Sequence, residues 1–318
     1  MLSVLLIVLP VFALILAGWL ARRLGALGPL ASGEINRFVV WLALPALLFD
    51  IVANARVADL WQPGFVAAFG LGMMAVFAVT IALRWRGKAG RHLADASIDG
   101  LNAAYANTGY IGFPLLAATL GQGAAAHAAM EMTLIASILT ICCLFALGII
   151  LVEVGLQAEG HPAHVVRKVA LSVARNPLVV APVLGALVMV SGQRLPAPAE
   201  TFLKLLGGAA SPCALVGLGL FLGEKRVAAP GAGAAATLLV ALKLLVQPAA
   251  TWALAVWVFH LPPLATHAAV LIAALPTGTG PFMVAEFYER EAGLTSRVVL
   301  LSTILSLATI TLYLARAL

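Results

Sequence analysis

Two short segments combine proline, glycine and small polar residues inside otherwise apolar stretches. The first runs from Asn107 to Pro114 and reads NTGYIGFP; the second runs from Pro276 to Pro281 and reads PTGTGP. Proline removes an intrahelical hydrogen bond and glycine tolerates unwound backbone, so each segment is predicted to interrupt a helix. Unwound backbone at membrane depth is tolerated only where it lines protein or a watery cavity.

An interrupted helix offers chemistry that a continuous helix lacks. The half-helix that follows each break begins with free N–H groups and a partial positive charge, and Pro114 and Pro281 suit its first turn. Two such ends form a site for an anion, to which amide and hydroxyl side chains add donors. We predict a substrate site of these residues: Asn107, Thr108, Gly109, Gly112, Pro114, Thr277, Gly278, Thr279, Gly280 and Pro281. A purely structural pair of kinks is the alternative.

The composition shows where these segments must lie. Of the 318 residues, 63% are hydrophobic and 10% are charged, whereas soluble domains carry about 45–50% and about 25%. A soluble enzyme, a nucleic-acid-binding protein and a disordered chain are therefore excluded, and a lipid bilayer is the expected surrounding. The basic residues are interpreted as topology signals despite the net charge of +6.

Ten apolar segments are predicted to span the membrane. They lie at about 2–20, 37–53, 64–83, 97–119, 128–153, 172–191, 201–222, 231–259, 266–285 and 296–315. No charge precedes Arg22, so the first is a retained helix and not a signal peptide. Fourteen of the 19 basic residues fall on one side of this arrangement, which predicts an inner-membrane protein with both termini extracytoplasmic.

Proline positions indicate an internal repeat. Five prolines recur at an offset of 167 residues: Pro10, Pro29, Pro45, Pro63 and Pro114 match Pro177, Pro196, Pro212, Pro230 and Pro281. Five helices are an odd number, so the second copy enters the membrane inverted, as in many secondary transporters. The predicted organisation is a first repeat at 1–153, a cytoplasmic linker at 154–171 and a second repeat at 172–318.

Few ionisable residues lie within the predicted spans. Glu131 and Asp50 are candidate coupling residues because an intramembrane carboxylate can carry a proton, although each lies near a helix end. Lys243 is either a substrate counter-charge or a side chain that snorkels to the interface. Asp95 and Asp99 are predicted to form an inner rim or helix N-cap. No metal site or cofactor is predicted, and the coupling ion, if there is one, is a proton or sodium.

The same segments resemble a known family. Asn36 and the run Leu44–Phe49, then Asn107–Leu115, then the stretch from Ala274 to Tyr288, resemble the auxin efflux carrier family, which includes plant auxin exporters and bacterial permeases for malonate or malate. The resemblance implies an all-α fold of ten transmembrane helices as two inverted repeats, similar to sodium/proton antiporters and bile-acid symporters. It also implies a scaffold part and a transport part with two crossing broken helices, which moves as an elevator.

These patterns predict a secondary active transporter of small organic anions, either mono- or dicarboxylates or an auxin-like weak acid. Its partners are the anion and the bilayer, without nucleic acid; a homodimer is left open, and no enzymatic activity is expected. The alternative is a sodium- or proton-coupled ion antiporter or symporter of the same fold. Against it, neither break contains a carboxylate. A receptor or channel is a third hypothesis.

Overall fold

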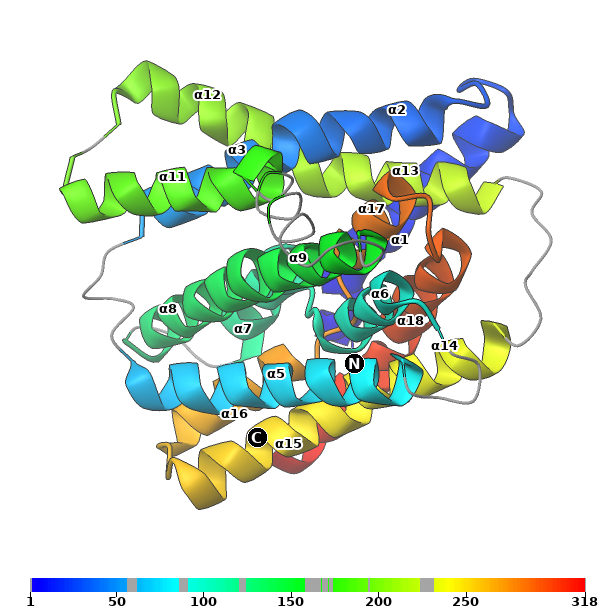
Figure 1. The fold of residues 1–318 in the computed structure, drawn as a ribbon. Helices are drawn as coiled ribbons and strands as arrows, with labels where there is room; N and C mark the ends of the chain where they lie inside the picture. The colour runs from blue at the N-terminus through cyan, green and yellow to red at the C-terminus, as the bar shows by residue number, and fades with distance from the viewer. Residues whose placement is uncertain are drawn as a thin grey trace.

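The computed structural model describes residues 2–55, 62–85, 91–119, 124–157, 174–193, 195–223 and 232–317, together with Arg167 and Leu171. Every regular element in these residues is helical (Figure 1). Six helical stretches are long and apolar enough to cross a membrane: Ala31–Ala53, Pro63–Trp85, Ala128–Leu156, Ala197–Gly223, Gly233–Val258 and Ala292–Arg316.

The helices of the first half follow the predicted segments closely. They are α1 Leu2–Arg23, α2 Ala31–Phe38, α3 Leu44–Ala53, α5 Pro63–Trp85, α6 Leu93–Ala104, α7 Phe113–Thr119, α8 Ala124–Ser137 and α9 Phe145–Leu156. Two π-helical segments, Val39–Ala43 and Ile138–Leu144, join α2 to α3 and α8 to α9. Each pair therefore forms one continuous rod.

The second half repeats this pattern of long and interrupted helices. Its elements are α11 Pro177–Ser191, α12 Ala197–Gly208, α13 Ala210–Gly223, α14 Ala232–Ala241, α15 Gln247–Ala253, α16 Pro263–Ala273, α17 Gly280–Phe287 and α18 Ala292–Ala317. The predicted single helix at 201–222 begins earlier and divides into α12 and α13 at Ala209. All ten predicted segments are mainly helical where they are described, and the clearest departures are residues 105–107 and 274–279. The count of ten spans and the inverted relation stay predictions.

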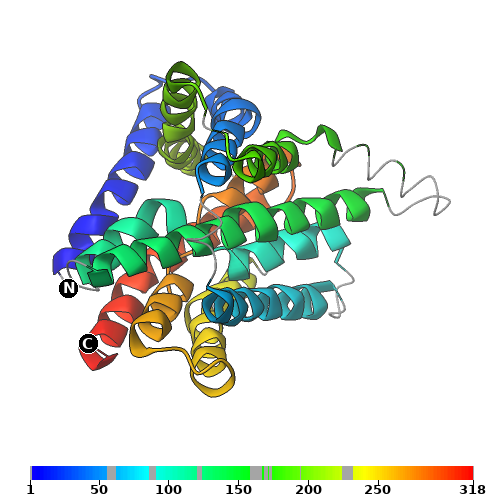
Figure 2. The same ribbon diagram turned by 90° about the vertical axis from the view of Figure 1, so that its left-hand side faces the viewer.

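The helices pack as two groups, which we call the panel and the core. The panel consists of α1, α2, α3, α11, α12 and α13, in which α1 packs on α13, and α3 on α11 and α12. Panel helices α2, α3, α11, α12 and α13 lie together in the upper half of Figure 1, and Figure 2 again places them above the others, with α1 descending obliquely. The remaining helices form the core.

Glycines allow the closest approaches within the panel. A Cβ atom at Gly219 would collide with the carbonyl oxygen of Ile15, and one at Gly18 would collide with that of Val216. These contacts bring the backbones of α1 and α13 together, as small residues do between membrane helices. The panel is therefore a tightly packed unit.

Ion pairs hold one edge of the core. Arg290 Nε lies 2.6 Å from Asp95 Oδ1, and Arg84 Nε lies 2.7 Å from Asp99 Oδ2. The hydrogen bond that Arg290 donates to the Asp95 carboxylate raises the pKa of Arg290 above its ordinary value. The prediction of an aspartate N-cap is wrong: His92 caps α6 by accepting from the Ala94 N–H. Each aspartate instead ties the start of α6 to an arginine elsewhere in the core.

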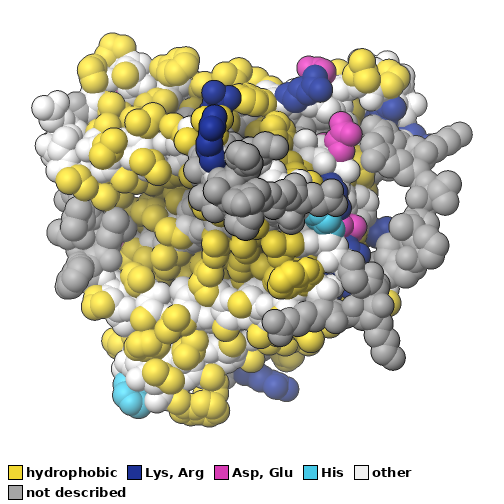
Figure 3. Space-filling model, viewed as in Figure 1, with side chains coloured by type: hydrophobic (Ala, Val, Ile, Leu, Met, Phe, Trp, Pro, Cys, Tyr) yellow, Lys and Arg dark blue, Asp and Glu magenta, His cyan; other side chains and the backbone are white. Residues whose placement is uncertain are grey.

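The exterior is apolar. Hydrophobic side chains cover most of the face in Figure 3, and the few visible charged groups gather mostly towards its right-hand edge. Large side chains exposed on the panel include Leu187 at 63%, Val190 at 76% and Leu205 at 75%. Such a surface is stable in lipid, which together with the six apolar spans makes this a multi-pass membrane protein.

Candidate functional site

The first interruption separates α6 from α7. Helix α6 ends at Ala104, the chain is extended at Tyr105, and the π-helical segment Thr108–Gly112 leads into α7. The N–H groups of Ile111 and Gly112 both donate to the carbonyl oxygen of Asn107. Pro114 is the second residue of α7, which continues directly from the helical segment that begins at Thr108. The prediction that Pro114 lies in the first turn of this half-helix is therefore wrong.

The second interruption has the same form. Helix α16 ends at Ala273, residues 274–279 are irregular, and α17 begins at Gly280 with Pro281 in its first turn. The structure thus confirms that both helices are interrupted and that Pro281 lies at the start of a new helix. The first break lies at residues 105–107, before the predicted glycine and proline positions, and the chain is helical again from Thr108. In the second break, Pro276 and Gly278 lie in the irregular stretch, where the helical hydrogen bonds are unmade.

The two interruptions cross each other as a short antiparallel bridge between Ala106 and Thr277. The N–H of Asn107 donates to the carbonyl of Pro276 (2.9 Å), and the N–H of Gly278 donates to the carbonyl of Tyr105 (3.1 Å). Backbone groups that left their helices therefore satisfy one another, as a low-polarity surrounding requires.

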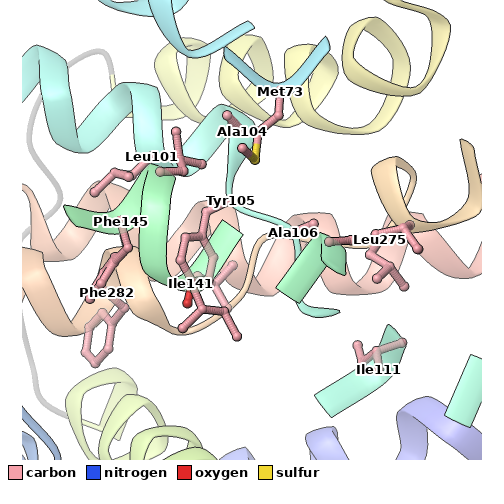
Figure 4. Close-up of a cluster of buried hydrophobic side chains, with 14 of the residues drawn as sticks. Met73, Leu101, Ala104, Tyr105, Ala106, Ile111, Ile141, Phe145, Leu275 and Phe282 are labelled. Carbon is pink, nitrogen blue, oxygen red and sulfur yellow. The ribbon is translucent and has the colours of Figure 1, made fainter. Parts of the chain in front are cut away.

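Aromatic packing surrounds this crossing. Figure 4 shows Tyr105 beside Ile141 and near Phe145 and Phe282; the ring centroids of Tyr105 and Phe145 are 5.5 Å apart. A Cβ at Gly278 would lie 2.8 Å from the Tyr105 ring, and one at Gly280 would lie 2.7 Å from it. Both glycines are needed because the ring occupies the space of a side chain.

A cavity of about 370 Å³ opens beside the crossing, between the panel and the core. Its core side is formed by Tyr105, Ala106, Asn107, Thr108, Gly109, Phe113, Ile141, Gly278, Thr279 and Met283. Its panel side is formed by Leu44, Leu47, Ile51, Gly207, Gly208, Ala210, Ser211 and Pro212. Sequence reasoning missed the panel side, although Pro45 and Pro212 are one of the matched proline pairs and mark this region of both halves.

Five of the ten predicted substrate-binding residues line the cavity: Asn107, Thr108, Gly109, Gly278 and Thr279. Thr277 instead supports the crossing, because its hydroxyl donates to the carbonyl of Asn102 (2.8 Å). Its N–H donates to Ser302 Oγ (3.1 Å).

Three of the other four predicted residues have packing positions around the crossing. Gly112 packs near Leu275 and Thr133, and Gly280 lies under the Tyr105 ring. Pro281 is buried at the start of α17. These three shape the crossing and are not among the lining residues, while the side chain of Pro114 lies outside the described part of the chain.

The candidate coupling carboxylates lie away from the cavity lining. Asp50 Oδ1 accepts a hydrogen bond from Asn54 Nδ2 (2.7 Å) at the end of α3. Glu131 is half-buried on α8. Lys243 is fully buried and does not snorkel, because its Nζ donates to the carbonyl of Ala273 (2.7 Å).

Two helix N-termini contribute to the electrostatics of the cavity. Both half-helices that start at the crossing, at Thr108 and at Gly280, begin beside the lining residues Gly109 and Thr279. Their first N–H groups have no acceptor within the helix, so they carry partial positive charge. No described residue that lines the cavity is charged, so these dipoles and the side chains of Asn107 and Thr108 are its strongest polar features.

An apolar helical bundle with two interrupted helices that cross beside a cavity has the architecture of a membrane transporter. Residues 3–314 match the family model described as "Membrane transport protein", so the chain belongs to this family. This confirms the family resemblance of the sequence motifs.

Named relatives extend over most of the chain. A Rhizobium meliloti (strain 1021) protein named "Putative malonate transporter" is 31% identical over 98% of this chain and 95% of its own length. An "Uncharacterized transporter" of Methanothermobacter thermautotrophicus is 27% identical over 96% of both chains. The mouse "Lysosomal cholesterol signaling protein" is 28% identical over 74% of this chain and 28% of its own length. The first two similarities span nearly the full length of both proteins.

Proposed function

We propose that this chain is a secondary active transporter of small organic anions, with a dicarboxylate such as malonate as the first substrate to test. The observation that carries the proposal is the position of the cavity at two positive helix ends. The name of the rhizobial relative supports malonate within this class. We place the chain in a bacterial inner membrane, as ten spans in two inverted repeats.

The volume and lining of the cavity suit such a substrate. Small-molecule sites occupy about 300–1,000 Å³, and this cavity of about 370 Å³ lies at the lower end of that range. Asn107 and Thr279 supply donors for a carboxylate, while Leu44, Leu47 and Met283 supply apolar contacts. A compact anion with a short hydrocarbon part matches this combination.

Alternating access follows from a movement of the core against the panel. The core is a unit because the bridge and the ion pairs lie within it. Its contacts with the panel include a hydrogen bond from Asn36 Nδ2 to the carbonyl of Met283 (3.2 Å) and two ring contacts, Trp41 with Phe287 and Phe221 with Phe282. The bound anion would travel with the core, as in an elevator, while the contacts between panel and core exchange.

Uptake of radiolabelled malonate into proteoliposomes tests the proposal. We expect Asn107→Ala to lower uptake at low substrate by about tenfold or more, since a hydrogen bond to a charged ligand contributes about 1.5–3 kcal/mol. Gln193→Ala is the matched control, because it removes a carboxamide from an exposed residue that is not among those lining the cavity. A folded Asn107→Ala protein with wild-type uptake contradicts the assigned site, and exchange of sodium or protons without malonate favours the ion-antiporter alternative.

A further inference from the structure

Two buried polar side chains lie one turn apart on the rod formed by α14, the π-helical segment Leu242–Val246 and α15. Lys243 and Gln247 are both fully buried. Neither lines the cavity. A buried ammonium group has a large desolvation cost, so its environment must offer strong compensation.

Both side chains donate to the ends of the interrupted helices. Lys243 Nζ donates to the carbonyl of Ala273, the last residue of α16, at 2.7 Å. Gln247 Nε2 donates to the carbonyl of Ala104, the last residue of α6, at 3.0 Å. One rod therefore caps the C-terminal end of both half-helices that stop at the crossing.

These two ends carry partial negative charge, because the last carbonyl groups of a helix have no intrahelical donor. Within the described residues, no acidic side chain forms an ion pair with Lys243. Its Nζ therefore has one of these ends as its partner, the carbonyl of Ala273, while the end at Ala104 is bonded by the neighbouring Gln247. Gln247 shows that a neutral amide can cap a helix end by hydrogen bonding. Capping alone therefore does not explain why position 243 holds a lysine, which can carry a positive charge.

We propose that Lys243 is a positioning residue that acts as the built-in counter-charge of the crossing: it neutralises the negative helix ends behind the bridge and makes the whole crossing attractive to an anion. This inference rests on the proposed function. Lys243 acts through the backbone of α16 and touches no substrate. A bound sodium ion is the alternative way to neutralise such ends, and the lysine makes that ion unnecessary.

Lys243→Gln tests the role of charge because glutamine keeps a donor and removes the ammonium group. We expect the Kd for malonate to rise about tenfold or more, measured by titration of purified protein in detergent. Gln247→Leu is the matched control: it removes a cap from the same rod without changing charge, and we expect a smaller rise in Kd. Unchanged malonate affinity in folded Lys243→Gln, or equal losses in both variants, overturns the proposal.

The protein without malonate provides a separate readout. We expect sodium chloride to raise the Tm of Lys243→Gln relative to N-methylglucamine chloride at equal ionic strength, and to leave the wild-type Tm unchanged. If sodium chloride shifts the Tm of the wild type and of Lys243→Gln equally, the proposal that Lys243 is the counter-charge is overturned. This Tm measurement needs no malonate. It therefore tests the role of Lys243 even if the wild-type protein does not bind malonate and the proposed substrate is wrong. Should Lys243→Gln not fold, a Tm increase specific to sodium in wild type overturns the inference, and no increase supports it.

Discussion

The ring of Tyr105 lies against Gly278 at the point where the two interrupted helices cross, so that a Cβ atom on the glycine would come within 2.8 Å of the ring. The same two residues are joined by a backbone hydrogen bond, from the N–H of Gly278 to the carbonyl of Tyr105. The bridge and the ring thus fix the spacing of the two segments together.

Gly278→Ala is expected to destabilise the protein by about 1–3 kcal/mol, because overpacking forces the ring or the bridge to move. Thermal unfolding in detergent measures the loss. Gly293→Ala is the control, since nothing lies within 4 Å of its Cβ position and it sits in the first turn of α18. Partial recovery in the double variant Tyr105→Ala, Gly278→Ala would assign the effect to the ring, whereas an unchanged Tm in the single variant would contradict it.

Two threonines two positions apart, Thr277 and Thr279, are expected to give different phenotypes. Thr277→Val removes a buried hydroxyl that donates to Asn102, so it should lower stability by about 1 kcal/mol. Thr279→Val removes a hydroxyl from the cavity lining, so it should raise the KM for malonate with little change in Tm. Uptake kinetics and thermal unfolding of both variants separate the roles, and identical behaviour of the two variants would refute the distinction.

Cross-linking the panel to the core is expected to stop transport. In a background without Cys142, Cys143 and Cys213, a short thiol cross-linker between Asn36→Cys and Met283→Cys should lower uptake about tenfold or more, because this pair joins the two groups.

The control cross-link uses Ser32→Cys and Gly217→Cys, a pair that lies within the panel. Uptake should persist in that protein. Full transport by the cross-linked Asn36–Met283 pair would exclude a sliding movement at this contact.

The ion pair between Asp95 and Arg290 is expected to contribute about 1 kcal/mol, since it is only partly buried. A double-mutant cycle of Asp95→Ala and Arg290→Ala, read by thermal unfolding, measures the coupling. The coupling should shrink at high salt because surface charges are screened. A coupling energy of zero at low salt would show that the pair adds nothing to the core.

The basic residues predict the orientation of the chain. Arg22 and Arg23 end α1, so a cysteine at Gly25, in the same cysteine-free background, should react with an impermeant thiol reagent only from the cytoplasmic side. A tag at the C-terminus should be accessible from outside. Labelling of the Gly25 cysteine in intact cells would reverse the predicted orientation.

The second interruption could be predicted from sequence because Pro276 and Gly278 act locally on the backbone. The first was predicted in the right helix, but the break lies at residues 105–107, before its glycines and proline. The pairing of Ala106 with Thr277 is a tertiary contact that the sequence pattern did not predict. The panel side of the cavity could not be predicted, since Leu44 and Leu47 have the same character as the lipid-facing leucines around them.

Side-chain direction was the other information that sequence lacked. Thr277 and Thr279 are chemically identical, and only the path of the chain turns one towards Asn102 and the other towards the cavity. The same holds for Lys243, whose buried position depends on a distant helix end at Ala273. Local sequence patterns indicated which helices are interrupted, whereas tertiary contacts determine which side chains support the crossing and which line the cavity.

The bridge between Ala106 and Thr277 joins residues that are 171 positions apart in the chain. During synthesis, the ribosome delivers the first of these two segments long before the second. Until the segment around Thr277 is inserted, the backbone amides around Ala106 lack these partners in the bilayer, unless insertion factors cover them. Completion of the last third of the polypeptide is therefore the event that commits the nascent protein to its mature form.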